Sequence, residues 1–471
     1  SAMRPGLLLL FLFLIYGVVS TTEDHPHRVV DLPGAPEDAP QFPLYAGFID
    51  IEMNETQHNI FYVLCEAIRA DPLESPLVVW LNGGPGASSL LGFSLEHGPY
   101  LLQESHTGPG EKKQPLRYND LSWNQYANVL YIESPTNVGF SHANRTIEAY
   151  DDYQTAKLNM KVLEAFMTRA HSRYYNRDFY ITGESYAGAY VPLFAQEIVL
   201  GLHSGEFTND NFRGMAIGNP TISIYLRQFD SSMQVFAMGM LPPRFGERLL
   251  PQWNLPYGVE EKQTIKKEIL EYYKGWSTNI TSLRFRYNLH ATCEEGEDIG
   301  IYHVENKKNN FECNAKRLAE RYFNDELVKK ALHVNSSSRW MPTTPAIMSV
   351  YDQIFDTVPA YKTIFNGVKD DFRVLFYAGD LDLICPSIHS ARGTAEIGNR
   401  NGFEEIADSP KVWSYLGDFG GARTSYRKRN SSITLDVLTI RGSGHMVPIN
   451  HPSRLFQVIN NFLFSNKTEI D

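Results

Sequence analysis

Short runs of β-forming residues alternate along the chain with segments of helical periodicity, and this alternation constrains the fold more than any other feature. Strands that alternate with helices predict a mostly parallel sheet with helices on both faces, because each parallel pair needs a crossover connection. The helical patterns cover residues 155–169, 189–202 and 453–464. The strand-like runs are residues 77–81, 129–132, 179–182, 214–217, 374–377 and 437–440. We therefore predict an α/β fold, preceded by an antiparallel hairpin of residues 46–51 and 59–65.

The alternation stops between residues 222 and 369, where the sequence is charged, aromatic and mostly helical, without a convincing strand pair. We predict an inserted helical cap over this range, with the α/β core formed by residues 21–221 and 370–471. Residues 260–274 and 317–332 have the pattern of surface helices. The polar residues 305–310 between them predict an exposed loop that is open to proteolysis.

The first residues have the pattern of a secretory signal, because Arg4 precedes an apolar run at residues 7–19 and the small residue Ser20 offers a cleavage site. The run is shorter than the roughly 20 residues that a membrane-spanning helix needs. We therefore predict removal of residues 1–20, no membrane span afterwards, and a secreted or lysosomal protein. Glycosylation sequons fit this route, although Pro220 blocks the triplet at Asn219. The sequons lie at Asn54, Asn144, Asn279, Asn335, Asn430 and Asn466.

The chain of 471 residues is 43% hydrophobic, so it can bury a large core. Its formal net charge of −11 argues against a nucleic-acid partner, since phosphate backbones are bound by excess Lys and Arg. Four cysteines in so long a chain cannot replace the core by a disulfide framework. Cys293 and Cys313 are close in sequence, and an oxidising compartment favours a bridge between them. Cys65 is expected to be a small buried apolar residue.

A serine stands between small residues directly after the strand-like run 179–182, in the sequence Gly-Glu-Ser-Tyr-Ala-Gly at 183–188. Small residues on both sides let a strand and a helix approach closely, while Ser185 is held in a strained turn with an exposed hydroxyl. The pattern predicts a nucleophile. Taken alone it is weak, because a serine between small residues is often only part of a turn.

Two later loops supply a carboxylate and a histidine, and both follow predicted strands. Asp380 and Asp382 lie on the first loop and His445 on the second. The order Ser, Asp, His is that of α/β-hydrolases, in which the histidine moves the proton and the carboxylate orients the ring. Separately, either aspartate could cap a turn and the histidine could be a loop residue. Their joint placement predicts a catalytic triad of Ser185, His445 and one of the two aspartates.

The glycine-rich sequence Trp-Leu-Asn-Gly-Gly-Pro-Gly-Ala-Ser at 80–88 follows another apolar strand and leaves backbone amides free to point at a ligand. We predict that the amides of Gly84 and Tyr186 stabilise an oxyanion formed at Ser185, because donors placed where charge develops lower the barrier. The competing interpretation is a tight Gly-Pro turn without a catalytic role.

Four of these segments together resemble the serine carboxypeptidase family, which has the α/β-hydrolase fold. The resemblance extends from about residue 45 to residue 464 and includes Ser-Trp-Asn at 122–124. It implies an enzyme that removes single residues from the free carboxyl end of peptides at acidic pH, through an acyl-enzyme. It implies no cofactor and no metal. The four segments are residues 80–89, 184–188, 379–385 and 445–448, and the resemblance also includes residues 133–141.

The resemblance also implies a carboxylate clamp, in which Asn82, the Gly83 amide, Glu96 and Glu184 hold the substrate's free carboxyl group and Trp80 packs nearby. Two neighbouring carboxyl groups cannot both ionise easily, so a shared proton would let the pair donate a hydrogen bond to the substrate. Deprotonation at higher pH would then weaken binding. Without the family pattern, the two glutamates would be taken as unrelated surface acids.

The family places its triad acid at the second aspartate, which implies Asp382 as the acid and Asp380 as a turn residue. Cys385 resembles a free thiol at the substrate pocket, sensitive to mercurials but not catalytic. Met446 resembles members that prefer an apolar C-terminal residue, called P1′ below. Ala87 stands where the family usually has a cysteine that bridges core and cap, so that bridge is expected to be absent.

Two further departures limit the resemblance, because Asn137 replaces a common glycine and the cap is only weakly similar. Among the properties that the resemblance implies, the substrate preference is therefore the one that it supports least. The expected partners are peptides or proteins with a free C-terminus, and a second copy of the chain in a homodimer. Two alternatives stay open: an acyltransferase or lyase on the same scaffold, and a noncatalytic partner that protects other enzymes.

Overall fold

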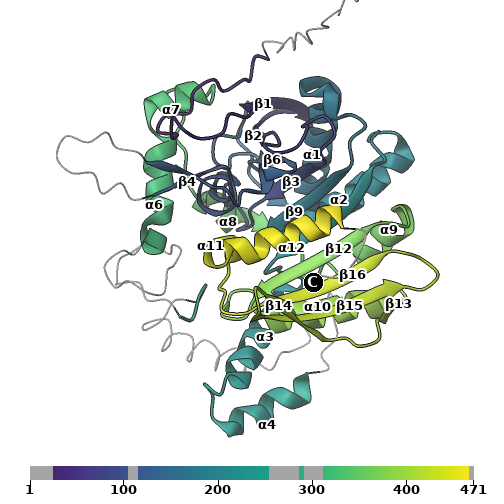
Figure 1. Cartoon of the computed structure of the whole chain (residues 1–471). Helices are drawn as coiled ribbons and strands as arrows, with labels where there is room; N and C mark the ends of the chain where they lie inside the picture. Colours follow the sequence, from purple (N-terminus) through teal and green to yellow (C-terminus); the bar gives the residue numbers. More distant parts are fainter. Residues whose placement is uncertain (1–24, 104–114, 254–285, 291–310, 466–471) are drawn as a thin grey trace, which may run out of the picture.

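The computed structural model describes residues 25–103, 115–253, 286–290 and 311–465, and a 12-stranded sheet runs through it (Figure 1). Six central strands are parallel, and each contains one of the predicted strand-like runs. In spatial order they are β6 (Asn128–Ile132), β3 (Leu77–Leu81), β9 (Phe179–Glu184), β10 (Phe212–Gly218), β12 (Arg373–Gly379) and β16 (Thr434–Ile440). The α/β architecture is therefore as predicted.

Antiparallel strands extend both edges of the sheet. The predicted hairpin forms β1 (Leu44–Met53) and β2 (Thr56–Cys65), which pairs with β6. At the other edge, β15 (Asp418–Lys428) pairs with β16, and β13 (Phe403–Glu405) and β14 (Lys411–Tyr415) pair with β15. The sequence did not predict these last three strands. Most of their side chains are exposed or half-buried, so the apolar alternation that marks a strand is weak.

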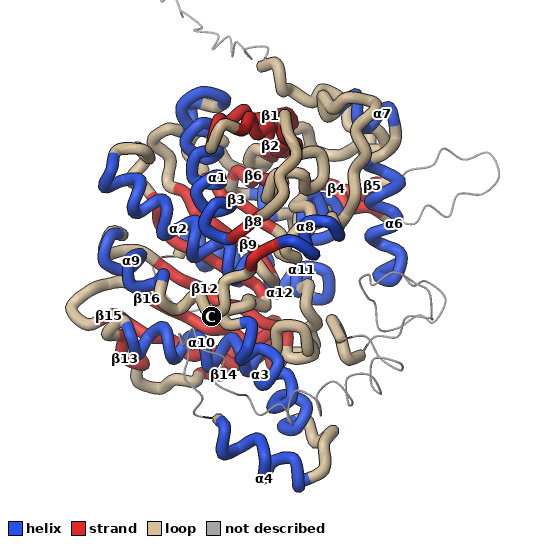
Figure 2. Tube along the Cα trace, turned by 180° about the vertical axis from the view of Figure 1, so that it is seen from behind, coloured by secondary structure: helices blue, strands red, loops and turns tan. Residues whose placement is uncertain are grey.

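Helices cover both faces of the sheet, as the parallel strands require. The helices α1 (Asp152–Ala165), α2 (Ala187–Ser204), α9 (Ala360–Gly367) and α10 (Ser387–Arg400) lie on one face and α12 (Pro452–Phe464) on the other (Figures 1 and 2). Successive side chains of β3 point to opposite faces of the sheet and so pack under different helices. Leu77 and Val79 pack in the core under α1 and α2, whereas Val78 and Trp80 pack in the core under α12.

The chain between β10 and β12 adds no strand to the large sheet among its described residues. Its one described strand, β11 (Tyr351–Asp352), pairs with β8 (Tyr150–Asp151), a small strand pair that the sequence did not predict. The predicted helix 317–332 is divided into α6 (Phe311–Phe323) and α7 (Glu326–Ala331), because the Asp325 side chain caps α7 by accepting from the Leu327 and Val328 amides. The cap boundaries at residues 222 and 369 stay a prediction.

Other helices and short strands are α3 (Ile224–Ala237), α4 (Gly246–Leu249), α8 (Pro345–Val350), α11 (Val447–Asn450), β4 (Tyr100–Leu102), β5 (Leu116–Tyr118) and β7 (His142–Ala143).

Several predictions concern the surface of the molecule or residues outside the described ranges. Asn54, Asn144, Asn335 and Asn430 are exposed, and Cys65 is a fully buried free cysteine. No helix in the described ranges is long and apolar enough to cross a membrane. The remaining sequence predictions lie outside the described residues: the signal at 1–20, the helix at 260–274, the loop at 305–310, Asn279, Asn466, and Cys293 of the expected bridge to Cys313.

Candidate active site

Ser185 lies in a tight turn between β9 and α2. Its backbone φ is 63°, a left-handed conformation that non-glycine residues rarely adopt. Its amide donates to Gly218 O at 3.0 Å, and its carbonyl accepts from Thr221 N at 2.9 Å. A β-carbon at Gly183 would lie 2.6 Å from the Ala187 side chain, so strand and helix approach too closely for larger residues. The turn holds a half-buried serine at the carboxyl edge of the sheet.

Asp382 and His445 meet beside this edge. Asp382 Oδ2 lies 2.6 Å from His445 Nδ1, and the carboxylate is fully buried. Three more donors reach it: Asn219 Nδ2 at 2.8 Å, the Ile384 amide at 2.7 Å and the Cys385 amide at 3.1 Å. These bonds fix the carboxylate against the imidazole, which is the arrangement that a triad acid would need to orient the ring.

Asp380 has a different environment. Its Oδ1 accepts from the Gly442 amide at 2.7 Å, which ties the loop after β12 to the loop after β16. Burial raises the pKa of this carboxyl, and the Gly442 amide opposes the rise. Asp380 therefore braces the loop that carries His445, while Asp382 contacts the histidine itself.

Residues 286–290 belong to the predicted cap and contact both catalytic loops. The His445 amide donates to Tyr287 O at 2.7 Å, and the two rings lie edge to face with their centroids 5.0 Å apart. On the acid loop, the Leu383 amide donates to Arg286 O at 2.9 Å. The sequence analysis missed this contribution, because residues 286–290 carry no motif and adjoin the histidine only in three dimensions.

Asn219 is a second residue that the sequence analysis did not assign to the site. Its side chain links the end of β10 to the end of β12 and the loop after it, because Nδ2 donates to Asp382 Oδ2 and the Cys385 carbonyl while Oδ1 accepts from the Gly379 amide at 3.2 Å. Its φ of 39° places it in a turn directly after β10. A polar residue at a strand end, next to a predicted active site, was the available signal.

The glycine-rich loop after β3 lies against the nucleophile turn. A β-carbon at Gly83 would lie 2.4 Å from the Tyr186 amide nitrogen, and Gly84 has a φ of 112°. Both positions therefore require glycine. The arrangement places Gly83, the residue before Gly84, beside the Tyr186 amide, and two amides that bind one oxyanion must lie close together.

Residues 342–344 of the predicted cap hold the same loop from outside. Ala87 forms an isolated antiparallel bridge with Thr343, the Ser88 amide donates to Pro342 O at 3.0 Å, and the Thr344 amide donates to Gly86 O at 2.9 Å. The contact occurs at the position where the related family usually has a bridging cysteine. Backbone hydrogen bonds thus join the loop to the cap here.

A buried network anchors this contact. Trp340 Nε1 donates to Glu133 Oε1 at 2.9 Å, and Ser88 Oγ donates to the same oxygen. The Phe140 amide donates to the other carboxylate oxygen at 2.6 Å. Burial raises the pKa of Glu133 to about 7, and these donors oppose the rise. Glu133 begins the segment 133–141 noted in the sequence, and this residue therefore supports the glycine-rich loop.

Asn82, Glu96 and Glu184 form one hydrogen-bonded group. Asn82 Nδ2 donates to Glu96 Oε1 at 3.1 Å and to Glu184 Oε1 at 3.0 Å. Its Oδ1 accepts from Trp80 Nε1 at 2.8 Å and from the Gly92 amide at 3.0 Å, which fixes the orientation of the amide. Glu96 and Glu184, hereafter the clamp pair, are both buried.

The clamp pair has unusual electrostatics. Burial raises the pKa of Glu96 to about 7, and the Asn82 amide opposes the rise. Burial raises the pKa of Glu184 well above its usual value, and the neighbouring Glu96 adds to the effect. The two carboxyl groups are hydrogen-bonded to each other, so the pair retains a proton where isolated glutamates would be ionised.

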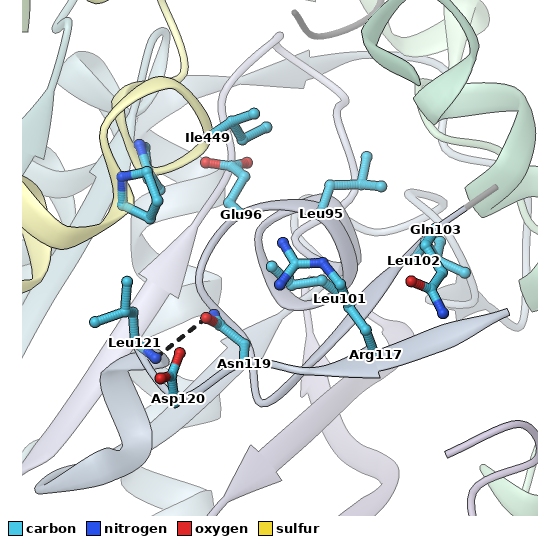
Figure 3. Close-up of a pocket in the computed structure, with 12 residues that line it drawn as sticks. Leu95, Glu96, Leu101, Leu102, Gln103, Arg117, Asn119, Asp120, Leu121 and Ile449 are labelled. Atoms are coloured by element: carbon cyan, nitrogen blue, oxygen red, sulfur yellow. Dashed lines mark hydrogen bonds between the residues drawn. The ribbon is translucent and has the colours of Figure 1, made fainter. Parts of the chain in front are cut away.

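A cavity of about 280 Å³ adjoins Glu96 (Figure 3). Leu95, Leu101 and Ile449 form part of an apolar wall, and the Arg117 side chain reaches across it. No His, Cys, Asp or Glu cluster among the described residues could hold a metal ion. The full lining is Leu95, Glu96, Leu101, Leu102, Gln103, Arg117, Asn119, Asp120, Leu121, Pro448, Ile449 and Pro452.

The other two predicted pocket residues, Met446 and Cys385, adjoin His445 and Asp382 respectively. Met446 is half-buried and follows His445 directly. Cys385 is a fully buried free cysteine whose Sγ lies 3.2 Å from Thr221 Oγ1. Burial raises the pKa of this thiol to about 11. The expected reaction with mercurials would therefore need the thiol to become exposed first.

Comparisons with known proteins agree with this geometry. A family model described as serine carboxypeptidase matches residues 33–465. Lysosomal protective protein from Mus musculus is 29% identical, and the alignment covers 98% of this chain and 98% of that protein. Serine carboxypeptidase-like 46 from Arabidopsis thaliana is 30% identical, with 97% and 96% covered.

Among solved structures, a prohormone-processing carboxypeptidase from Saccharomyces cerevisiae is 18% identical and aligns with a TM-score of 0.65. The alignment covers 93% of this chain and 95% of the yeast chain, and at this identity it shows the fold alone. The α/β-hydrolase fold predicted from the sequence is thus confirmed. Since the family model spans nearly the whole described chain, the protein belongs to the serine carboxypeptidase family.

Proposed function

We propose that the protein hydrolyses the last peptide bond of peptides that end in a free carboxylate, through an acyl-enzyme on Ser185. One observation carries the proposal: Asn82 binds the buried clamp pair, which retains a proton, at the edge of the sheet where Ser185 lies. A protonated pair with a fixed amide can donate hydrogen bonds to a substrate carboxylate, whereas two ionised glutamates would repel it.

The mechanism that we propose uses Ser185, His445 and Asp382 as a catalytic triad. Ser185 Oγ attacks the last peptide carbonyl while His445 Nε2 takes the serine proton, and Asp382 holds Nδ1–H and stabilises the imidazolium. The amides of Gly84 and Tyr186 receive the negative charge on the carbonyl oxygen. His445 then gives its proton to the leaving amino group. Water, activated by the same histidine, hydrolyses the ester and restores the enzyme.

The pH dependence of binding follows from the clamp pair. Burial raises the pKa of Glu96 to about 7 and that of Glu184 well above its usual value, so the pair is protonated at acidic pH and begins to lose protons as the pH rises through about 7. KM for a substrate with a free carboxylate should therefore increase toward alkaline pH. Tighter substrate binding at lower pH supports an enzyme that works best in an acidic medium.

The site also supports an apolar P1′ residue. Glu96 borders the apolar cavity of Figure 3, so a side chain next to a clamped carboxylate has Leu95 and Ile449 within reach. Met446, beside His445, adds a flexible apolar surface. A C-terminal leucine or phenylalanine fits these surroundings better than a charged residue.

We further propose that the protein enters the secretory route and reaches the lysosome or the cell exterior. The signal pattern at residues 1–20 and the exposure of Asn54, Asn144, Asn335 and Asn430 support this route. Expression in a eukaryotic cell should yield a chain that loses residues 1–20 and shifts in mass on glycosidase treatment. An unshifted, uncleaved chain in the cytosol would contradict the proposal.

The decisive test of the activity compares an N-blocked Phe-Leu acid with its C-terminal amide at acidic and neutral pH. The free acid should be cleaved rapidly at acidic pH, the amide much more slowly, and neither by Ser185→Ala. Equal cleavage of acid and amide would contradict the clamp. No cleavage by folded protein would favour acyl transfer or a noncatalytic role instead.

A further inference from the structure

The order of the strands places the carboxylate clamp on one side of Ser185 and the side chains of Thr221 and Cys385 on the other. Asn82 follows β3, whereas Thr221 follows β10 and Cys385 follows β12, and β9 with Ser185 at its end lies between β3 and β10. A peptide whose terminal carboxylate occupies the clamp, with its last bond at Ser185, extends away from β3. Its P1 residue, on the amino side of that bond, therefore points toward Thr221 and Cys385.

Arg227 lies on α3 at this end of the site. Its Nη1 donates to Thr221 Oγ1 at 2.9 Å and approaches Cys385 Sγ at 3.9 Å, and the side chain is half-buried. The amide of Thr221 bonds the carbonyl of Ser185. The guanidinium is therefore linked to the nucleophile through a single intervening residue.

The charge of Arg227 faces the site. Burial raises the pKa of the Cys385 thiol, and the positive charge of Arg227 opposes this rise. Burial likewise raises the pKa of Tyr186 and of Tyr287, and Arg227 opposes both effects. Tyr186 follows the nucleophile and Tyr287 packs on His445, so the guanidinium lies within electrostatic reach of both catalytic groups.

Arg227 has no carboxylate partner within the described ranges, in contrast to two other half-buried arginines. Arg392 pairs with Asp230, and Arg423 pairs with Asp436 at 2.8 Å. A guanidinium has five N–H donors, and a hydroxyl and a thiol engage few of them. Since a half-buried charge without a counter-ion is unfavourable, the position is suited to an anion brought by the substrate.

We propose that Arg227 binds the carboxylate of a glutamate or aspartate side chain at P1, so that the protein prefers peptides with an acidic penultimate residue. The inference rests on the proposed function and names the substrate class of the same site. Thr221 and Cys385 hold the guanidinium in place. The P1 carboxylate accepts hydrogen bonds from the guanidinium N–H groups that Thr221 and Cys385 do not engage. Such charge-assisted pairs are about twice as strong as neutral hydrogen bonds.

Three N-blocked dipeptides test this preference, with glutamate, glutamine or lysine at P1 before a common C-terminal leucine. We expect kcat/KM to be roughly tenfold higher for glutamate than for glutamine, and lowest for lysine. In Arg227→Gln the glutamate-to-glutamine ratio should fall to about one. In Arg227→Glu, lysine should become the preferred P1 residue. Ratios between substrates are the readout, so a general loss of activity in a variant cancels.

Two controls separate recognition from a structural effect. Arg244→Gln removes the same charge from an exposed position in the same insertion and should leave the ratio unchanged. In the unmodified protein the ratio should also rise with pH as the P1 side chain ionises near its ordinary pKa of about 4.3. A merely structural role of Arg227 would not produce this titration.

The possible outcomes distinguish the inference from the proposed function. Ser185-dependent cleavage of all three peptides with a glutamate-to-glutamine ratio near one would overturn the inference and leave the carboxypeptidase activity intact. An equal loss on both peptides in Arg227→Gln would assign Arg227 a structural role. Failure of the folded protein to cleave any of them would overturn both proposals.

Discussion

Asp382 and the clamp pair are buried carboxyl groups on either side of the same active site, and their surroundings favour opposite charge states. Apart from the hydrogen bond between its own two carboxyl groups, the clamp pair has one donor side chain among the described residues, the amide of Asn82. Asp382 is surrounded by donors, and a carboxylate that accepts several hydrogen bonds is stabilised in its ionised form. These donors are Asn219, Ile384, Cys385 and His445.

The difference shows that burial alone does not decide whether a carboxyl group is charged. Both sites are withdrawn from water, yet one is arranged to hold a negative charge and the other to hold a proton. The number and kind of hydrogen-bond donors make the distinction. A triad acid must stay ionised to stabilise an imidazolium, whereas a carboxylate-binding pair must stay protonated to accept an anion.

Removing the charge of Asp382 should have the largest effect. In Asp382→Asn the side chain no longer stabilises the imidazolium, and an amide donor facing Nδ1 favours the wrong tautomer, so kcat should fall by about 10⁴-fold. Steady-state kinetics on the Phe-Leu acid measures this, with circular dichroism to show that the fold is retained. A loss of less than tenfold would mean that Asp382 is not the triad acid.

Removing one donor from Asp382 should have the next largest effect. In Asn219→Ala the carboxylate loses a 2.8 Å hydrogen bond, and kcat should fall roughly tenfold to a hundredfold with little change in KM. Comparing kcat and KM for the same peptide provides the measurement. If KM rose instead while kcat stayed constant, Asn219 would act on substrate binding rather than on the acid.

Making the clamp pair unable to ionise should change the pH profile. With glutamine at both Glu96 and Glu184, the amides donate at every pH, so KM should stay nearly constant from acidic to alkaline pH. In the unmodified protein KM should begin to rise near pH 7, by up to about tenfold per pH unit, as Glu96 of the pair ionises. Equal slopes in both proteins would place the titrating group elsewhere.

Replacing Asp380 should have the smallest effect. Asp380→Asn retains a side-chain oxygen that can accept from the Gly442 amide, so kcat should change by less than about threefold. The matched pair of Asp380→Asn and Asp382→Asn thus tests directly which aspartate serves the histidine. An inactive Asp380→Asn beside an active Asp382→Asn would reverse the assignment.

The sequence predicted the parts of the fold and the site that local patterns encode. The parallel strands are continuous apolar runs, and Ser185 and His445 lie in short motifs at strand ends, so both could be recognised without the structure. The edge strands β13–β15 escaped prediction because their side chains are largely exposed. Predictions that fall on residues 254–285 and 291–310 lie outside the described residues.

Contacts between distant segments could not be predicted in the same way. Tyr287 reaches His445 across more than a hundred and fifty residues of sequence, and Trp340 reaches Glu133 across more than two hundred. Neither Tyr287 nor Trp340 lies in a sequence motif that indicates its role. Arg227 also looks like an ordinary surface cation in the helical pattern of α3, and only its position between Thr221 and Cys385 distinguishes it.

The contact between Ala87 and Thr343 has a consequence for the conditions under which the protein can work. Hydrogen bonds join the glycine-rich loop to the cap at a position where the family usually has a disulfide bridge. Thiol reductants cannot break these bonds, and Cys65 and Cys385 are free thiols that form no disulfide at this contact. The shape of the glycine-rich loop should therefore not depend on a disulfide there, whether the surrounding medium is oxidising or reducing.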